Sequence, residues 1–185
     1  MKYTVTREKI LASLKDALEN LDYVHAMWEG GAAAFGRLDE WSDIDLQIDV
    51  DDNRVEDTFS VIERTVSILS PSNRKCRTPQ LPWEGLFQVF YQLQNASPYL
   101  LVDIVVIQHG AKEKLLQAEI HGNAVILFDK SGVAQIPLFD WVDWKSRLCE
   151  RLAVLRITFP MFQPLVLCPG SKYKLKSAPI SLDKA

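Results

Sequence analysis

Three aspartates and a glycine pair are the residues of this chain whose types and spacing best suit a chemical task. Asp43 and Asp45 stand one residue apart in the segment SDIDLQIDV. Along a strand, residues with this spacing project to the same side, about 7 Å apart. Two carboxylates so placed repel each other unless a cation lies between them, and hard oxygen ligands suit Mg²⁺ or Mn²⁺. The pair predicts a divalent-metal site at the start of a strand; the alternative is an edge strand whose polar face meets water.

A third aspartate lies where a charge is costly. Asp103 is the only charged residue in the apolar run LLVDIVVI, so we expect both faces of this strand to be buried. An isolated buried carboxylate must be protonated, ion-paired or bound to a metal. If its strand lies beside the strand of Asp43 and Asp45, the three carboxylates converge and can hold two divalent ions.

Gly30 and Gly31 provide the other half of such a site. They follow an expected strand over 23–30 and precede a short run of small residues, AAAFG. A glycine turn between a strand and a helix lets backbone N–H groups approach an anion closely, and phosphate is a natural guest. A lone glycine pair is more often a plain turn, but phosphate beside a two-metal site suits phosphoryl or nucleotidyl transfer.

The segment GGAAAFGRLDEWSDIDL resembles the signature of the nucleotidyltransferase superfamily, which includes DNA polymerase beta, aminoglycoside nucleotidyltransferases and the minimal nucleotidyltransferases. In this alignment Gly31 and Ala32 occupy the glycine–serine step and Gly36 the second glycine. Asp103 occupies the third carboxylate position, on a later strand. The similarity covers roughly residues 23–107 and implies a nucleotidyltransferase-like mixed sheet flanked by helices.

The resemblance also implies a mechanism. Asp43 and Asp45 would ligate both metal ions, and Asp103 would complete one site and help to deprotonate an acceptor hydroxyl. That hydroxyl would attack the α-phosphate of a nucleoside triphosphate such as ATP, and pyrophosphate would leave. The cofactor is thus Mg²⁺ or Mn²⁺, and the acceptor is a hydroxyl of a small molecule or a protein.

The triphosphate contacts implied by the resemblance come from the turn and the loop after it. They are Gly30, Gly31, Ala32, Arg37 and Ser42. Arg37 has an equal alternative as a surface ion-pair partner. Ala32 replaces the family's serine, so one hydroxyl donor is missing, which costs a few kcal/mol at most and affects rate rather than class. Three tryptophans, Trp28, Trp41 and Trp83, are candidates for stacking on a base, although a core position is the commoner role of such a residue.

Helices and strands alternate around these residues. Amphipathic helices are expected over 6–21, capped by Thr6, and from a capping box of Asn53 and Glu56 to about Ser70. Strands are expected over 23–30, 42–50, 86–93, 99–108 and 124–128, with a loop over 71–85. Within 42–50 the apolar residues share one face: Ile44, Leu46, Ile48 and Val50. The order predicts an α/β or α+β domain with a mixed sheet of four to five strands.

The expected catalytic domain covers residues 1–135, and residues 136–185 form a C-terminal extension. A helix is expected from about Asp140, followed by an irregular tail with four prolines that interrupt every helical pattern. Members of the superfamily that modify small molecules generally add a helical domain here. The acceptor site would then be incomplete or completed by a homodimer or a small helical partner protein. The apolar face of the helix suits such an interface or packs on its own sheet.

Composition excludes several other classes. The formal charge of −3 argues against sequence-independent binding of nucleic acid, although basic clusters occur at 74–77 and 172–176, which we expect to be solvated loops. No apolar run approaches the roughly 18 residues needed to span a membrane. Because the amino end is charged throughout, we expect a cytoplasmic protein. The cysteines, Cys76, Cys149 and Cys168, and the histidines, His25, His109 and His121, lack zinc-site spacing, so we expect free thiols and structural or surface histidines.

Three hypotheses follow. The first is a metal-dependent nucleotidyltransferase. The second is a catalytically weak or inactive nucleotide-binding partner protein, such as the antitoxin of a toxin–antitoxin pair, which Ala32 and the short C-terminal region favour. The third is a purely structural domain in which Asp103 is ion-paired to an arginine.

Overall fold

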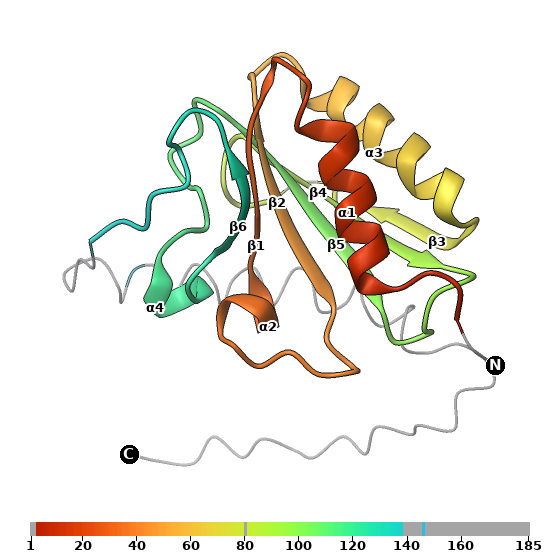
Figure 1. Cartoon of the computed structure of the whole chain (residues 1–185). Helices are drawn as coiled ribbons and strands as arrows, with labels where there is room; N and C mark the ends of the chain where they lie inside the picture. The colour runs from red at the N-terminus through yellow and green to blue at the C-terminus, as the bar shows by residue number, and fades with distance from the viewer. Residues whose placement is uncertain (1–2, 80, 139–145, 147–185) are drawn as a thin grey trace, which may run out of the picture. The chain divides into compact units, whose positions relative to one another are not determined.

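Two parallel strands form the centre of a six-stranded mixed sheet (Figure 1). A computed structural model describes residues 3–79, 81–138 and 146 of the chain. The strand order is β3-β4-β5-β2-β1-β6. The strands are β1 Val24–Glu29, β2 Ile44–Val50, β3 Ser72–Arg77, β4 Leu86–Leu93, β5 Leu101–Gln108 and β6 Val125–Asp129. β2 and β5 pair in parallel, and all other neighbours are antiparallel. The predicted mixed α and β class is confirmed, with one strand more than expected.

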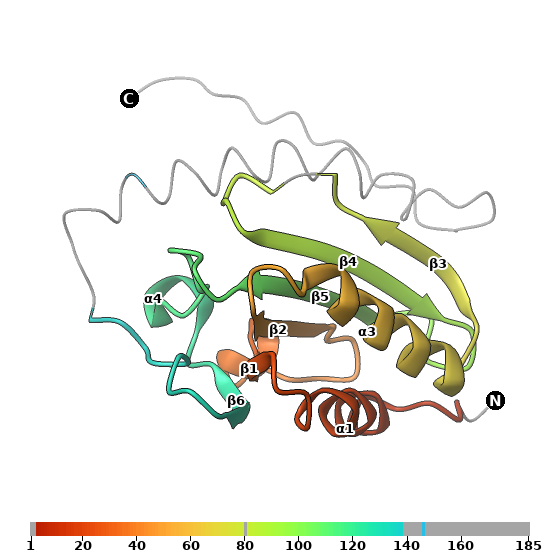
Figure 2. The same cartoon turned by 90° about the horizontal axis from the view of Figure 1, so that it is seen from above.

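Two long helices, α1 and α3, cover one face of the sheet (Figure 2). The helices are α1 Arg7–Leu18, α2 Gly31–Ala34, α3 Val55–Leu69 and α4 Ala118–His121. The start of α1 is fixed as predicted, because the Thr6 hydroxyl accepts the backbone N–H of Lys9 at 3.4 Å. α1 and α3 contact each other as well as the sheet, so one continuous core lies beneath them.

Strict alternation in β2 produces this core. Its apolar side chains are fully buried on the helix-covered face, as predicted: Ile44, Leu46, Ile48 and Val50. Residues of β1 and β5 on the opposite face join a second apolar cluster, in which Trp28, Val105 and Ile107 are buried. β2 lies between β5 and β1. The alternative of a water-facing edge strand is therefore wrong.

One strand and one cap differ from the prediction. β3 forms within the segment expected to be a loop. Its residues, SNRKCR, are poor strand formers by composition, but they become a strand by pairing with β4. The predicted capping box is absent. Arg54 precedes α3 without a side-chain cap bond, and Glu56 accepts instead from Arg77 of β3 at 2.8 Å. The basic cluster at 74–77 thus lies on an edge strand whose Lys75 also pairs with Glu63 at 2.7 Å.

The predicted C-terminal elements lie outside the described residues, apart from Ser146, which is helical. All other described residues, 3–79 and 81–138, belong to one compact unit. Across the described ranges, no helix combines the length and the apolar character that crossing a bilayer requires.

Two isoleucines of α3 test the assignment of the core. Ile62 is fully buried, whereas Ile68 is 80% exposed. We expect Ile62→Ala to lower the free energy of unfolding by about 2–5 kcal/mol, because it removes core contacts and leaves a cavity. Ile68→Ala, the matched control, should change it by at most about 0.5 kcal/mol. Urea unfolding of both variants measures the difference, and similar losses would mean that α3 packs with another face.

Candidate active site

The central feature of the site is a pair of aspartates on adjacent strands. Asp45 of β2 is in register with Asp103 of β5. Register partners in neighbouring parallel strands project to the same face, so these two side chains are neighbours. Both are partly exposed. The sequence predicts that these carboxylates meet only if their two strands are neighbours in the sheet. The strands are neighbours, so this condition is met.

Asp43 lies at the same end of the strand pair. Its Oδ1 accepts the backbone N–H of Leu101 at 3.1 Å, which ties the entry of β2 to the first residue of β5. Its negative charge raises the pKa of Asp103, as does that of Asp45. The carboxylate oxygens of Asp43, Asp45 and Asp103 do not come within 4.8 Å of one another as a group of three. One ion would therefore contact all three only after side-chain rotation.

Burial makes the charge on all three carboxylates costly. Burial, with a smaller contribution from the two neighbouring carboxylates, raises the pKa of Asp103 to about 8. Two hydrogen bonds from Gln88 Nε2 to the Asp103 oxygens, each 2.9 Å long, act in the opposite direction. Burial also raises the pKa of Asp43 and Asp45. Without a cation, Asp103 is therefore protonated at neutral pH, and a divalent ion would displace that proton.

The nearest cationic side chain serves another carboxylate. Arg7, the first residue of α1, pairs with Glu29 and donates to the backbone carbonyl of Asp43 at 2.6 Å. Its charge lowers the pKa of Asp45, but burial outweighs it. Within the part of the chain described, no ion pair neutralises Asp43, Asp45 or Asp103. The sequence held no signal for Arg7, because only the packing of α1 brings it here.

The third hypothesis, an arginine paired with Asp103, is not what the structure shows. The side-chain partner of Asp103 is Gln88, a neutral residue of β4. A neutral amide offers hydrogen bonds but no compensating charge.

The glycine turn touches Asp45 directly. Gly30 donates its N–H to the Asp45 carbonyl oxygen at 2.8 Å. Gly31 has a φ of 53°, and a Cβ on it would lie 1.8 Å from Asp45 Oδ2. A side chain at position 31 would therefore occupy the space of the Asp45 carboxylate. Only glycine combines this backbone conformation with so close an approach.

The helix after the turn is too short to add a strong helix dipole to the site. α2 has four residues, Gly31–Ala34, and Ala32 is partly buried within it. A single turn carries little of the dipole that accumulates along a longer helix. An anion here would meet the N–H groups of the turn rather than a helix field.

Arg37 and Ser42 make local contacts in the structure. The Arg37 guanidinium lies over the ring of Phe35, 4.6 Å from its centroid. The Ser42 hydroxyl donates to Asp39 Oδ1 at 2.6 Å within its own turn. Their role as triphosphate contacts stays a prediction.

The three tryptophans divide by exposure. Trp28 is fully buried and Trp83 packs against the second apolar cluster. Trp41 is 56% exposed and meets the ring of Tyr99 edge-on, with centroids 4.7 Å apart. Trp41 precedes Asp43 by two residues. Of the three, it is the one whose exposure allows it to stack on a base at this end of the sheet.

Two other features lie at the opposite end of β2 and β5. A pocket of about 460 Å³ opens beside Gln108, between Trp83 and Lys112, away from the carboxylates. His25, Asp49 and His109 are also brought together there. These three residues come from segments far apart in the chain, so no local spacing in the sequence groups them. Cys76 is a free thiol as predicted, and the other two cysteines lie outside the described residues.

Comparison with known proteins adds no relative to this geometry. No protein-family model matches the chain, and no curated protein matches it.

Gly31→Ala and Gly36→Ala form a matched pair of tests. Both glycines have a left-handed φ, 53° and 63°, so alanine costs each about 1–2 kcal/mol of backbone strain. At Gly31 the new Cβ also meets the Asp45 carboxylate, whereas nothing lies within 4 Å of it at Gly36. We expect Gly31→Ala to turn this carboxylate away and to weaken Mg²⁺ binding about tenfold or more, a loss of about 1.4 kcal/mol. Calorimetric titration with Mg²⁺ and a nucleoside triphosphate measures this, and equal affinities in the two variants would contradict it.

Asp103→Asn should stabilise the metal-free protein increasingly as pH rises. The folded-state pKa of Asp103 is about 8, whereas an unfolded aspartate has a pKa of about 3.9. Between these values the folded chain keeps a proton that the unfolded chain has released. The wild type therefore loses stability with rising pH, by up to about 1.4 kcal/mol per unit, until about pH 8. Urea unfolding of both proteins with a chelator present, from about pH 5 to 8, checks this. Parallel pH profiles would show that Asp103 titrates normally.

Proposed function

We propose that the protein is a metal-dependent nucleotidyltransferase that moves a nucleoside monophosphate from a nucleoside triphosphate to a hydroxyl of a small molecule or a protein. One observation carries this proposal. Asp45 and Asp103 are register partners on the two parallel strands, and the Gly30–Gly31 turn lies against Asp45. A set of carboxylates beside a backbone turn is the combination that nucleotidyl transfer uses. The superfamily resemblance of the segment from Gly30 to Leu46 supports the same reading.

The donor set fits divalent metal ions. Asp43, Asp45 and Asp103 offer hard oxygen ligands, are partly exposed and lack a neutralising cation in the region described. Mg²⁺ or Mn²⁺ suits such ligands. When bound, the ions would polarise the phosphate oxygens and lower the pKa of the acceptor hydroxyl. Asp43 and Asp45 would hold both ions, and Asp103 would complete one of the two sites.

Each group of the site then has a defined task. Asp103 helps to take the proton from the acceptor hydroxyl, whose oxygen forms a bond to the α-phosphorus. The bond from that phosphorus to the bridging oxygen breaks, and pyrophosphate leaves with the electron pair. Gly31, without a side chain, leaves room for the Asp45 carboxylate, and the Gly30 N–H is already donated to the Asp45 carbonyl oxygen. The phosphates would therefore meet the N–H groups that follow Gly30 in the turn. Gln88 keeps the Asp103 carboxylate oriented through both of its oxygens.

A nucleotide-binding partner protein without turnover is the second candidate. Ala32 favours it, because the hydroxyl donor that serine would supply at this position is missing. Loss of one donor to the transition state lowers a rate by about 10²–10³-fold. Binding would remain, since the backbone N–H groups of the turn do not depend on the side chain.

Asp45→Asn tests the proposed chemistry. We expect it to lower pyrophosphate release from a nucleoside triphosphate with Mg²⁺ by about a thousandfold, equivalent to about 4 kcal/mol, because both ions lose a ligand. The assay screens the four common triphosphates, since the preferred base is unknown. Asp16→Asn, an exposed change on α1, is the control and should keep full activity.

The outcomes separate the two candidates. Mg²⁺-dependent binding of triphosphate without pyrophosphate release, lost in Asp45→Asn, supports the partner protein. Binding and release that are both unchanged in Asp45→Asn would remove Asp45 from the site. Absence of any triphosphate binding to the wild type would contradict both candidates.

A further inference from the structure

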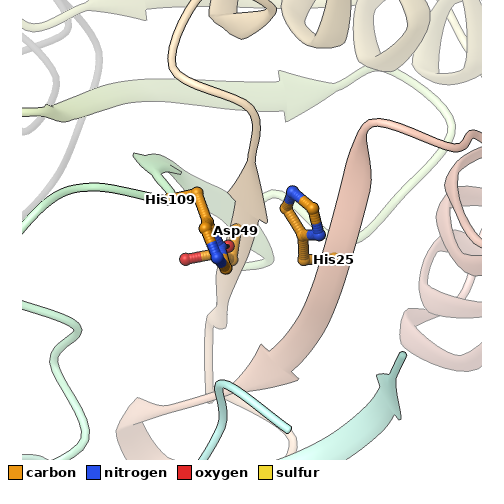
Figure 3. A group of neighbouring side chains, drawn as sticks. All are labelled: His25, Asp49 and His109. Atoms are coloured by element: carbon orange, nitrogen blue, oxygen red, sulfur yellow. Dashed lines mark hydrogen bonds and ion pairs between the residues drawn. The ribbon is translucent and has the colours of Figure 1, made fainter. Parts of the chain in front are cut away.

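Three metal-ligating side chains meet at the end of the sheet opposite the carboxylates (Figure 3). His25 comes from β1, Asp49 from β2, and His109 directly follows β5. One ligand atom from each lies within 4.8 Å of the other two. Asp49 lies four positions after Asp45, about 13 Å along a strand. We propose that His25, Asp49 and His109 bind a divalent transition metal, preferably Zn²⁺, at a site separate from the carboxylates. This inference does not depend on the proposed function.

Asp49 is the anchor of the cluster. Its side chain is fully buried, so its charge must be compensated. Lys114 Nζ lies 2.5 Å from Asp49 Oδ2 and is itself held by the carbonyl oxygens of Gln108 and His109, both at 2.8 Å. Oδ1 lies 2.6 Å from His109 Nδ1. The lysine therefore fixes one oxygen, and the other faces the histidine side of the cluster.

His25 carries the oriented geometry that metal-binding histidines have. Its Nε2 lies 2.7 Å from Asp51 Oδ1. A ring nitrogen that donates to a carboxylate leaves the other nitrogen with a lone pair for a metal and raises its basicity. The His25 and His109 rings lie side by side, with centroids 4.2 Å apart and planes 37° apart. The ring contact keeps the two imidazoles close together, and one nitrogen of each lies within 4.8 Å of the other and of an Asp49 oxygen.

Chemistry and access decide which ion fits. Two imidazole nitrogens and one carboxylate are typical ligands of Zn²⁺, whereas Mg²⁺ prefers oxygen. The side chains of His25 and His109 are 22% and 47% exposed, so an ion can enter from solvent. The carboxylates of Asp49 and Asp51 and the ammonium of Lys114 together carry one net negative charge. A divalent ion would therefore leave the cluster with a small net positive charge. Three protein ligands with such a charge leave a fourth position for water or an anion.

The competing explanation is a hydrogen-bonded network without an ion. In that case His109 and Lys114 alone satisfy Asp49, and His25 only packs on His109. The two explanations differ in what His25 contributes. A network would not need the pairing of His25 with Asp51, whereas a metal ligand would depend on it.

Zinc titration of the full chain tests the site. After metal removal, the protein competes for Zn²⁺ with a chromophoric chelator. We expect one Zn²⁺ per chain and at least about 100-fold weaker binding in His25→Ala and in His109→Ala, more than typically follows loss of a supporting partner. Asp51→Asn removes such a partner and should weaken binding by about 10–100-fold. These positions are partly or fully exposed, so the fold should tolerate the changes.

Two controls locate the ion. His121→Ala changes a histidine of α4 outside the cluster and should leave the affinity for Zn²⁺ unchanged. Asp45→Asn should also leave it unchanged, which separates this site from the carboxylates. Added Zn²⁺ should raise the melting temperature of the wild type but not of His25→Ala, because a ligand stabilises only a state that binds it.

Three results would overturn the inference. They are a wild type that takes up no Zn²⁺, an affinity that both histidine variants retain, and an affinity that only Asp45→Asn removes. The first two would leave the cluster as a hydrogen-bonded network, and the third would place the ion at the carboxylates.

Discussion

The parallel pairing of β2 with β5 is the constraint on which the rest of the structure depends. Parallel neighbours require a long connection, and here α3, β3 and β4 supply it. A shift of the pairing by one residue would turn Asp103 toward the aliphatic core beneath the helices. The alternation in β2 opposes such a shift, because its apolar residues would then lose their burial. Hydrophobic packing thus holds the two carboxyl groups side by side, although their proximity makes it costly for both to be charged.

This arrangement is electrostatically unfavourable within an otherwise apolar sheet. Burial and like charges act together on Asp103, and Gln88 relieves only part of their effect. A domain built for stability alone would not place a carboxylate there, since a largely desolvated carboxylate without a counter-charge destabilises a fold. Perturbed carboxylates of this kind concentrate at functional sites. The glycine at position 31 adds to this argument, because it gives up side-chain packing to make room for Asp45.

The sequence predicts these features where local pattern and tertiary structure agree. Alternation located β2 and its buried face, the apolar run located β5, and Thr6 located the start of α1. The predictions that were wrong share a cause, because each structure depends on a partner that is distant in the sequence. β3 needed the edge of β4, and Glu56 was drawn from its cap by Arg77. The cluster around His25 needed the irregular pairing of β1 with β2 between Val24 and Ala26, which no periodicity reveals.

β2 is held rigidly inside the sheet, whereas the connection that precedes it is exposed. The neighbouring strands β1 and β5 hold β2 along both sides, so the backbone at Asp45 cannot shift without disturbing the core. The connection from Phe35 to Trp41 is exposed and presents Phe35, Leu38 and Trp41 to solvent. This exposed rim can therefore change in sequence while the packed strands beneath it keep their carboxylates in place.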